Sequence, residues 1–130
     1  MPDAPRARAR ANQIISIMDN YGYRPLIWDI FVERVRASAH GRDPDEAKIA
    51  AAVPRAALCL RALAELADLK GLYLTGSEIS LADLHAAPMF AYFSMAKEGA
   101  ELLALQPRLH GWWQAMRERP SIVATRSPLE

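Results

Sequence analysis

Helical periodicity is the feature of this sequence that most restricts its fold. Apolar residues recur every three or four positions from Ala7 to Tyr21 and again from Ile49 to Ala67, which places them on one stripe of a helix. No segment alternates apolar and polar residues over enough positions to build a sheet, and segment 72–76 is the only strand-like piece. The sequence therefore predicts an all-α fold.

Prolines, glycines and acidic residues set the expected helix ends. The first helix should begin near Asp3 or Pro5 and bend or break near Gly22 and Pro25, because proline lacks an amide proton and restricts the residue before it. The apolar line then resumes to about Val35.

The second helix should begin at the acidic run 43–46, with Asp43 as cap and Pro44 at the first helical position. Pro54 should kink this helix and Gly71 should cap its end. Later helices are predicted over 81–95, 98–105 and 107–117, with a final turn after Pro120.

The stretch GSEISLADLHAAP, residues 76–88, carries the clearest local signal. Ser80 as N-cap can accept a hydrogen bond from the Asp83 amide, while the Asp83 carboxylate can accept one from the Ser80 amide. Ile79 and Leu84 occupy the two positions of a hydrophobic staple around this capping box. We interpret all four residues as structural, and they fix where a helix starts.

The histidines and the cysteine show no pattern of a metal site or a nucleophile. Asp83 and His85 cannot easily converge on one ligand, because residues two apart on a helix point about 200° apart. His40 and His110 have no metal-ligand spacing with the other histidine or with the single cysteine, Cys59. We expect no metal, no disulfide, and a small buried thiol at Cys59.

Charge and hydropathy give no sign of a nucleic-acid or membrane partner. The formal net charge is +1 and the charged residues are mixed along the chain. Arg6, Arg8 and Arg10 spread around a helix without an aromatic platform, which favours a solvated helix face over a nucleic-acid contact. With no signal peptide or long apolar span, we expect a soluble cytoplasmic protein.

Three segments together resemble the glutathione S-transferase family. The segment GSEISLADLHAAPMFAYF is similar to the motif that begins the family's sixth helix, which is its central core helix. RARARANQIISIMDNYGYRPLIWDIFVERV looks like the family's fourth helix, and LHGWWQAMRERPSIVATR looks like the ending of bacterial members. The resemblance covers nearly the whole chain.

The resemblance implies a single C-terminal helical domain over residues 1–130, built of about five or six helices. In the family a thioredoxin-like domain precedes it, binds glutathione and carries the residue that stabilises the thiolate. That domain is absent here, so we expect no catalytic residue and no cofactor in this chain. Glutathione would be the co-substrate of a full-length parent, and the 130 residues alone should be inactive.

In the family, the helical half forms one wall of the pocket for the electrophile and much of the dimer contact. The resemblance places Ile15, Met18, Asp19 and Tyr23 on the side of the first helix that could face this pocket. The alternative is that Ile15 and Met18 are plain core. A homodimer, a small electrophile and a role in detoxification are the further implications.

Two other functions remain open at this stage. Helical domains resembling this one are also attached to translation factors and aminoacyl-tRNA synthetases, where they serve as non-catalytic interaction modules. The helical unit could also act alone as a small-molecule binder, with an uncovered apolar patch that promotes self-association.

Trp112 and Trp113 are adjacent, so one is expected in the core and the other toward a neighbour or a groove.

Overall fold

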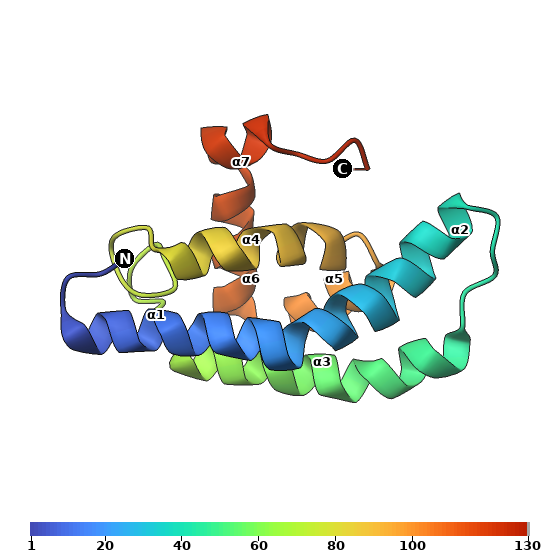
Figure 1. Ribbon diagram of the computed structural model, residues 1–130, viewed down its shortest axis with the longest axis horizontal. Helices are drawn as coiled ribbons and strands as arrows, with labels where there is room; N and C mark the ends of the chain where they lie inside the picture. The colour runs from blue at the N-terminus through green and yellow to red at the C-terminus, as the bar shows by residue number, and fades with distance from the viewer. Residues whose placement is uncertain (130) are drawn as a thin grey trace.

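The first element of the computed structural model, which describes residues 1–129, is one long continuous helix. It comprises α1 (Pro5–Ile17), η1 (Met18–Arg36) and the short α2 (Ala37–Ala39), and it runs along one side of the molecule (Figure 1). The backbone at both junctions is right-handed helical. The helix therefore does not break near Gly22 and Pro25; it bends, and the part that leads to α2 runs at an angle to α1 (Figure 1).

The geometry of η1 explains why proline does not end this helix. Its hydrogen bonds follow the π pattern, in which an amide pairs with the carbonyl five residues back. Leu26 and Ile30 are fully buried next to the buried Pro25, so core packing outweighs the missing amide donor. The longer turn also shifts the buried positions, and Tyr21, expected on the apolar stripe, is 69% exposed.

Helix α3 (Glu46–Leu66) packs along η1 and continues through Pro54. Its N-cap is Asp45, whose carboxylate accepts a hydrogen bond from the Lys48 amide at 3.0 Å. The cap predicted at Asp43 is wrong, because the Asp45 amide is held by the Glu33 carboxylate at 3.2 Å, a contact that sequence spacing does not show.

The connector 67–80 joins α3 to the next helix and needs glycine at Gly71. Helix α3 ends before this residue, so the prediction that Gly71 caps it is wrong. A Cβ at Gly71 would lie 2.2 Å from the Gly76 carbonyl oxygen, so close approach within the connector explains the glycine. Tyr73 and Gly76 form an isolated bridge, and no strand occurs among residues 1–129. The strand-like expectation for 72–76 reduces to this bridge.

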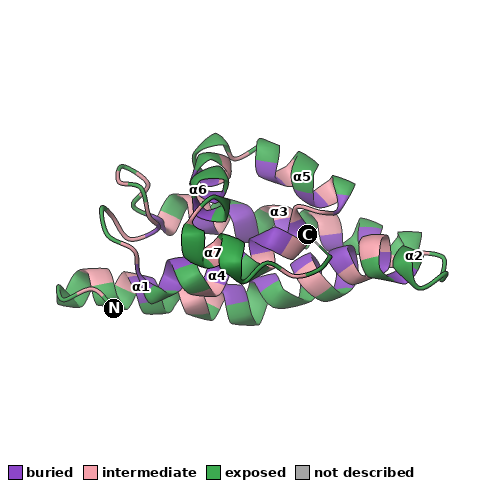
Figure 2. Cartoon of the chain, turned by 90° about the horizontal axis from the view of Figure 1, so that it is seen from above, coloured by how far each residue is buried: buried purple, intermediate pink, exposed green. Residues whose placement is uncertain are grey.

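The remaining helices complete a bundle around a shared core. They are α4 (Leu81–Phe93), α5 (Lys97–Ala104), α6 (Pro107–Arg117) and α7 (Pro120–Ala124). The described residues thus form six continuous helices, which confirms the expected all-α bundle of about five or six. Figure 2 shows the buried residues on the facing sides of these helices.

A buried carboxylate organises the start of α4. The amide and hydroxyl of Ser80 donate to Asp83 Oδ2, each at 2.9 Å, and Ser80 Oγ accepts from the Ala82 amide at 3.2 Å, which completes a capping box. Asp83 Oδ1 accepts two more bonds at 2.8 Å, from the Leu74 amide and from Trp112 Nε1. We call Asp83 with these four partners the Asp83 hub; it ties the connector and α6 to α4.

The apolar flanks of this helix start differ in burial. Ile79 is half-buried against the core, whereas Leu84 is 44% exposed. The staple between them stays a prediction. Trp112 and Trp113 are both buried, and Trp112 also lines a small hollow beside the connector. Both indoles pack against Phe90, with ring centroids 5.1 Å and 6.3 Å from it, and this aromatic cluster fills the centre between α4 and α6.

Candidate functional site

Asp19 of η1 and His85 of α4 meet across the surface between their helices. His85 Nε2 lies 2.7 Å from Asp19 Oδ1, and the two side chains are 36% and 52% exposed. A carboxylate bonded to one ring nitrogen fixes the orientation of the imidazole and leaves the other nitrogen available. This pair is therefore an accessible polar contact on the surface between η1 and α4.

The other predicted wall residues differ in accessibility. Met18 is fully buried in the core. Ile15 is half-buried and packs against the core. Tyr23 is 44% exposed and lies edge-on to Trp28, with ring centroids 6.4 Å apart. Asp19 and Tyr23 are thus the two predicted residues with accessible polar groups.

A more apolar surface lies between the first helix and α3. It is a groove of about 540 Å³ lined by Ile17, Asn20, Tyr21, Arg24, Pro25, Arg55, Leu58, Cys59 and Ala62, which we call the Tyr21 groove. Tyr21 is 69% exposed and Leu58 is 57% exposed. Large apolar side chains left open beside polar ones are typical of interaction surfaces.

Two arginines at the Tyr21 groove are held by one buried carboxylate. Asp29, only 2% exposed, accepts from Arg24 Nε at 3.1 Å and from Arg55 Nη2 at 2.7 Å. Both cationic side chains remain more than half exposed. The groove therefore has an apolar surface beside fixed positive charge.

The next turn of η1 buries a second carboxylate. Glu33, 5% exposed, accepts from Arg42 at 3.0 Å, from Lys48 at 3.1 Å and from the Asp45 amide at 3.2 Å. The Arg42 hydrogen bond is the main cause that lowers the pKa of Glu33 to about 2, against the opposing effect of burial. We call Asp29, Glu33 and their cations the η1 ion cluster.

Cys59 contributes no ready nucleophile to the Tyr21 groove. It is 4% exposed, and burial raises the pKa of its thiol to about 11. Because the thiolate is the reactive form, this cysteine stays protonated and inert near neutral pH. Residues 1–129 contain no cluster of three or more His, Cys, Asp or Glu side chains that could hold a metal ion. None of the helices in this part of the chain is both long and apolar enough to cross a membrane.

The main features of these surfaces have no local signal in the sequence. His85 and Asp19 are 66 residues apart, so only the packing of α4 on η1 brings them together. Tyr21 falls on the predicted apolar stripe, and its exposure follows from the π pattern of η1. Leu58 was visible only as one of several leucines of a helix.

Comparisons with known proteins agree on one family. The model of the family described as "Glutathione S-transferase, C-terminal domain" matches residues 16–120. A search of curated proteins finds no match.

Solved structures with the same fold include three glutathione transferases. The apo form of glutathione S-transferase III superposes with a TM-score of 0.80 and 24% identity over 90% of this chain and 53% of that chain. Glutathione transferase F7 from Populus trichocarpa superposes with a TM-score of 0.77 and 24% identity over 94% of this chain and 56% of that chain. A glutathione S-transferase from Xanthobacter autotrophicus superposes with a TM-score of 0.68 and 23% identity over 92% of this chain and 55% of that chain. The chain therefore spans about half the length of the solved structures it matches.

Proposed function

The chain belongs to the glutathione S-transferase C-terminal domain family, and on that premise we propose that it is the helical half of a glutathione transferase. The observation that carries the proposal is the asymmetric coverage, 90% of this chain against 53% of the matched structure. A thioredoxin-like domain ahead of residue 1 would supply the other half. The bacterial type of the parent, its cytoplasmic location and its role in detoxification are parts of this proposal that rest on the sequence resemblance.

In such a parent the two halves divide the chemistry. The other domain lowers the pKa of the glutathione thiol, and the thiolate then forms a carbon–sulfur bond with an electrophile as the leaving group departs with its electron pair. Two solved relatives are a glutathione S-transferase I bound to lactoylglutathione and one bound to an atrazine glutathione conjugate. These relatives support glutathione as the co-substrate of the parent.

The part of this chain in that reaction is to bind and orient the electrophile. Asp19 and Tyr23 offer accessible polar groups, Ile15 adds apolar surface, and Met18 supports them from the core. The imidazole of His85 holds the Asp19 carboxylate in place at 2.7 Å. Cys59 is protonated and buried. The Tyr21 groove therefore offers no thiolate of its own in place of the glutathione thiolate.

We assign the Tyr21 groove to the homodimer contact. Tyr21 and Leu58 would be covered by a second copy, and burying such side chains gains roughly 1.5–3 kcal/mol each. Sedimentation of Leu58→Arg should show loss of the dimer. Leu105→Arg is the matched control, because Leu105 is 73% exposed and does not line the groove. Monomeric wild-type chain at high concentration would refute this assignment.

The reading frame upstream of residue 1 tests the function itself. A thioredoxin-like pattern with a Ser, Cys or Tyr near its start would support the transferase, whereas another domain would support an interaction module of the translation-factor or synthetase type. In the parent, Tyr23→Ala and Asp19→Ala should raise KM for the electrophile without changing KM for glutathione, and Leu105→Ala should change neither. Conjugation of glutathione to a chloronitrobenzene substrate by the 130 residues alone would contradict the proposal.

A further inference from the structure

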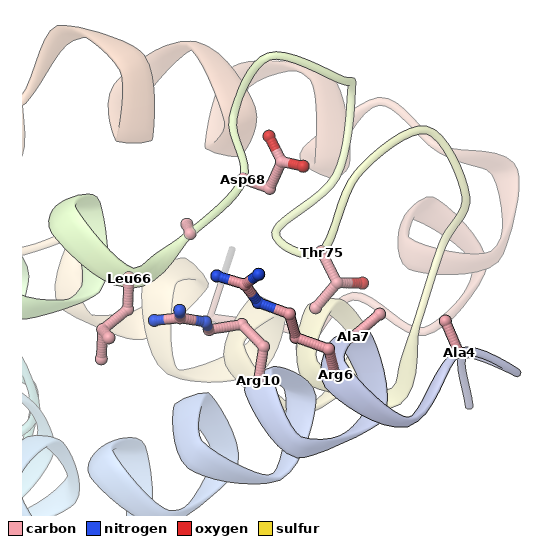
Figure 3. Close-up of a pocket in the computed structure, with 8 residues that line it drawn as sticks. Ala4, Arg6, Ala7, Arg10, Leu66, Asp68 and Thr75 are labelled. Carbon is pink, nitrogen blue, oxygen red and sulfur yellow. The ribbon is translucent and has the colours of Figure 1, made fainter.

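A separate hollow lies between the start of α1 and the end of α3. Its volume is about 480 Å³, within the range of roughly 300–1,000 Å³ typical of small-molecule sites. Arg6 and Arg10 line one side and Asp68 and Thr75 of the connector line the other. Figure 3 shows both guanidinium groups turned from α1 into the hollow, and Asp68 across from them with its carboxylate directed away from the two arginines.

The two arginines have no bonded partner within the described part of the chain. Neither Arg6 nor Arg10 has a hydrogen bond or an ion pair with any of residues 1–129. Like charges four positions apart on a helix repel each other, so the bare pair is unfavourable as it stands. Guanidinium groups bind carboxylates through paired hydrogen bonds, which makes this wall a receptor for an anionic group.

The backbone of α1 adds to the same positive field. The N-cap Ala4 makes no side-chain hydrogen bond, and the first turn carries no acidic residue. Ala4 and Ala7 line the hollow, so the unpaired amides of the first turn lie beside it. Unlike the arginines of the η1 ion cluster, Arg6 and Arg10 make no ion pair with a carboxylate in the described part of the chain.

The opposite wall decides what kind of anion fits. Asp68 lines the hollow without an ion pair to either arginine, and its carboxylate would repel a simple anion. It would attract an ammonium group, and the Thr75 hydroxyl can donate or accept beside it. The two walls thus carry opposite charges across a space the size of a small molecule.

We propose that this hollow binds a small zwitterion, an amino acid or a short peptide with a free amino group. Its carboxylate pairs with Arg6 and Arg10, and its ammonium group pairs with Asp68. The site is separate from the Tyr21 groove and from the Asp19–His85 pair, because none of their residues lines it. The proposal therefore does not depend on the transferase function.

The test is an NMR titration of the 130-residue chain with L-glutamate as the probe. Saturable shifts are expected at the Ala7 and Thr75 amides. Arg10→Ala and Arg6→Ala should weaken binding by about tenfold each, as expected for loss of a charge-assisted hydrogen bond. Arg8→Ala is the matched control, because Arg8 lies on the same helix outside the hollow, and it should leave binding unchanged.

A second ligand tests the role of Asp68. Glutarate has the two carboxylates of glutamate but no ammonium group, and it should bind at least about threefold more weakly. In Asp68→Asn the two ligands should bind equally well. Absence of saturable shifts at these amides, an equal loss in Arg8→Ala, or glutarate binding as tightly as L-glutamate to the wild-type chain would each overturn the proposal.

Discussion

The Asp83 hub and the η1 ion cluster both bury carboxylates, but they satisfy them with opposite kinds of donor. Asp83 is 0% exposed and accepts only from neutral groups, namely backbone amides, a hydroxyl and an indole. Asp29 and Glu33 are 2% and 5% exposed and are neutralised mainly by arginine and lysine side chains that reach into solvent. Burial of the acid is the same, whereas burial of its partners is not.

The difference lies in what happens to the partners when the acid is removed. The donors of the Asp83 hub are themselves buried, so they would be left without an acceptor and would carry the full desolvation penalty. The exposed cations of the η1 ion cluster can turn to water instead, and their pairs are screened by salt. The hub should therefore dominate stability, and the ion cluster should set the response to pH and salt.

Asp83→Ala should give the largest effect of any substitution in either region. It leaves the Leu74 amide and Trp112 Nε1 buried without an acceptor, at a cost on the order of 3–5 kcal/mol. Urea unfolding followed by circular dichroism measures the change in the free energy of unfolding. Asp68→Ala, which removes an exposed aspartate, serves as the control and should change it by less than about 0.5 kcal/mol. A loss below about 1 kcal/mol in Asp83→Ala would contradict the comparison.

Of the two regions compared, acid should act mainly on the η1 ion cluster. The folded pKa of Glu33 is lowered from 4.5 to about 2, so its stabilising contribution is complete above 4.5 and is lost as pH falls from 4.5 toward 2. We expect this loss to be about 1–2 kcal/mol, less than the full value of the shift because water reaches its cationic partners. Unfolding curves across this range measure it, and Glu33→Gln should flatten the dependence on pH. An equally steep loss in that variant would assign it to other groups.

Ser80→Ala should weaken the hub without dismantling it. Asp83 keeps the Leu74 and Trp112 donors, and only the cap of the Ala82 amide and one hydroxyl bond are lost. The expected cost is about 1 kcal/mol in the free energy of unfolding. Ser77→Ala, at an exposed position of the connector, should change little. A cost as large as that of Asp83→Ala would mean that the serine, and not the aspartate, organises this helix start.

The smallest effect is expected at the exposed edge of the ion cluster. The Arg24 side chain is 67% exposed and is one of two arginines on Asp29, so Arg24→Gln should cost at most about 1 kcal/mol. The difference from the wild-type chain should shrink further in 1 M salt, where the Debye length is about 3 Å. A difference that stayed constant with salt would show that packing, and not charge, is what Arg24 contributes.

Sequence reasoning succeeded where the signal is local. The capping residue Ser80 and its reciprocal partner Asp83 are three positions apart, so the start of α4 could be predicted from spacing alone. The start of α1 at Pro5 and the span of α6 were predicted for the same reason. The local signal at Pro25 could not decide between a bend and a break, because burial of Leu26 and Ile30 outweighs a local breaker and the sequence does not show that burial.

The candidate sites depended on contacts between distant segments. Asp19 was predicted as a wall residue, but its partner His85 is on another helix, and no spacing rule joins them. Arg6 and Arg10 were expected on a solvated helix face. Only the fold of the connector, which brings Asp68 and Thr75 opposite them, turns that face into a hollow.

The hub should also protect a backbone amide of the irregular connector from exchange with solvent as strongly as an amide inside a helix. The Leu74 amide lies outside every helix, yet it donates to a fully buried carboxylate that also holds the start of α4 and the indole of α6. Because one buried carboxylate holds all three attachments, we expect the hydrogen of this amide to exchange with solvent mainly when they open together. In deuterated water this one connector amide should persist as long as those of the core helices, which would mark the connector as part of the molecule's slowest cooperative unit.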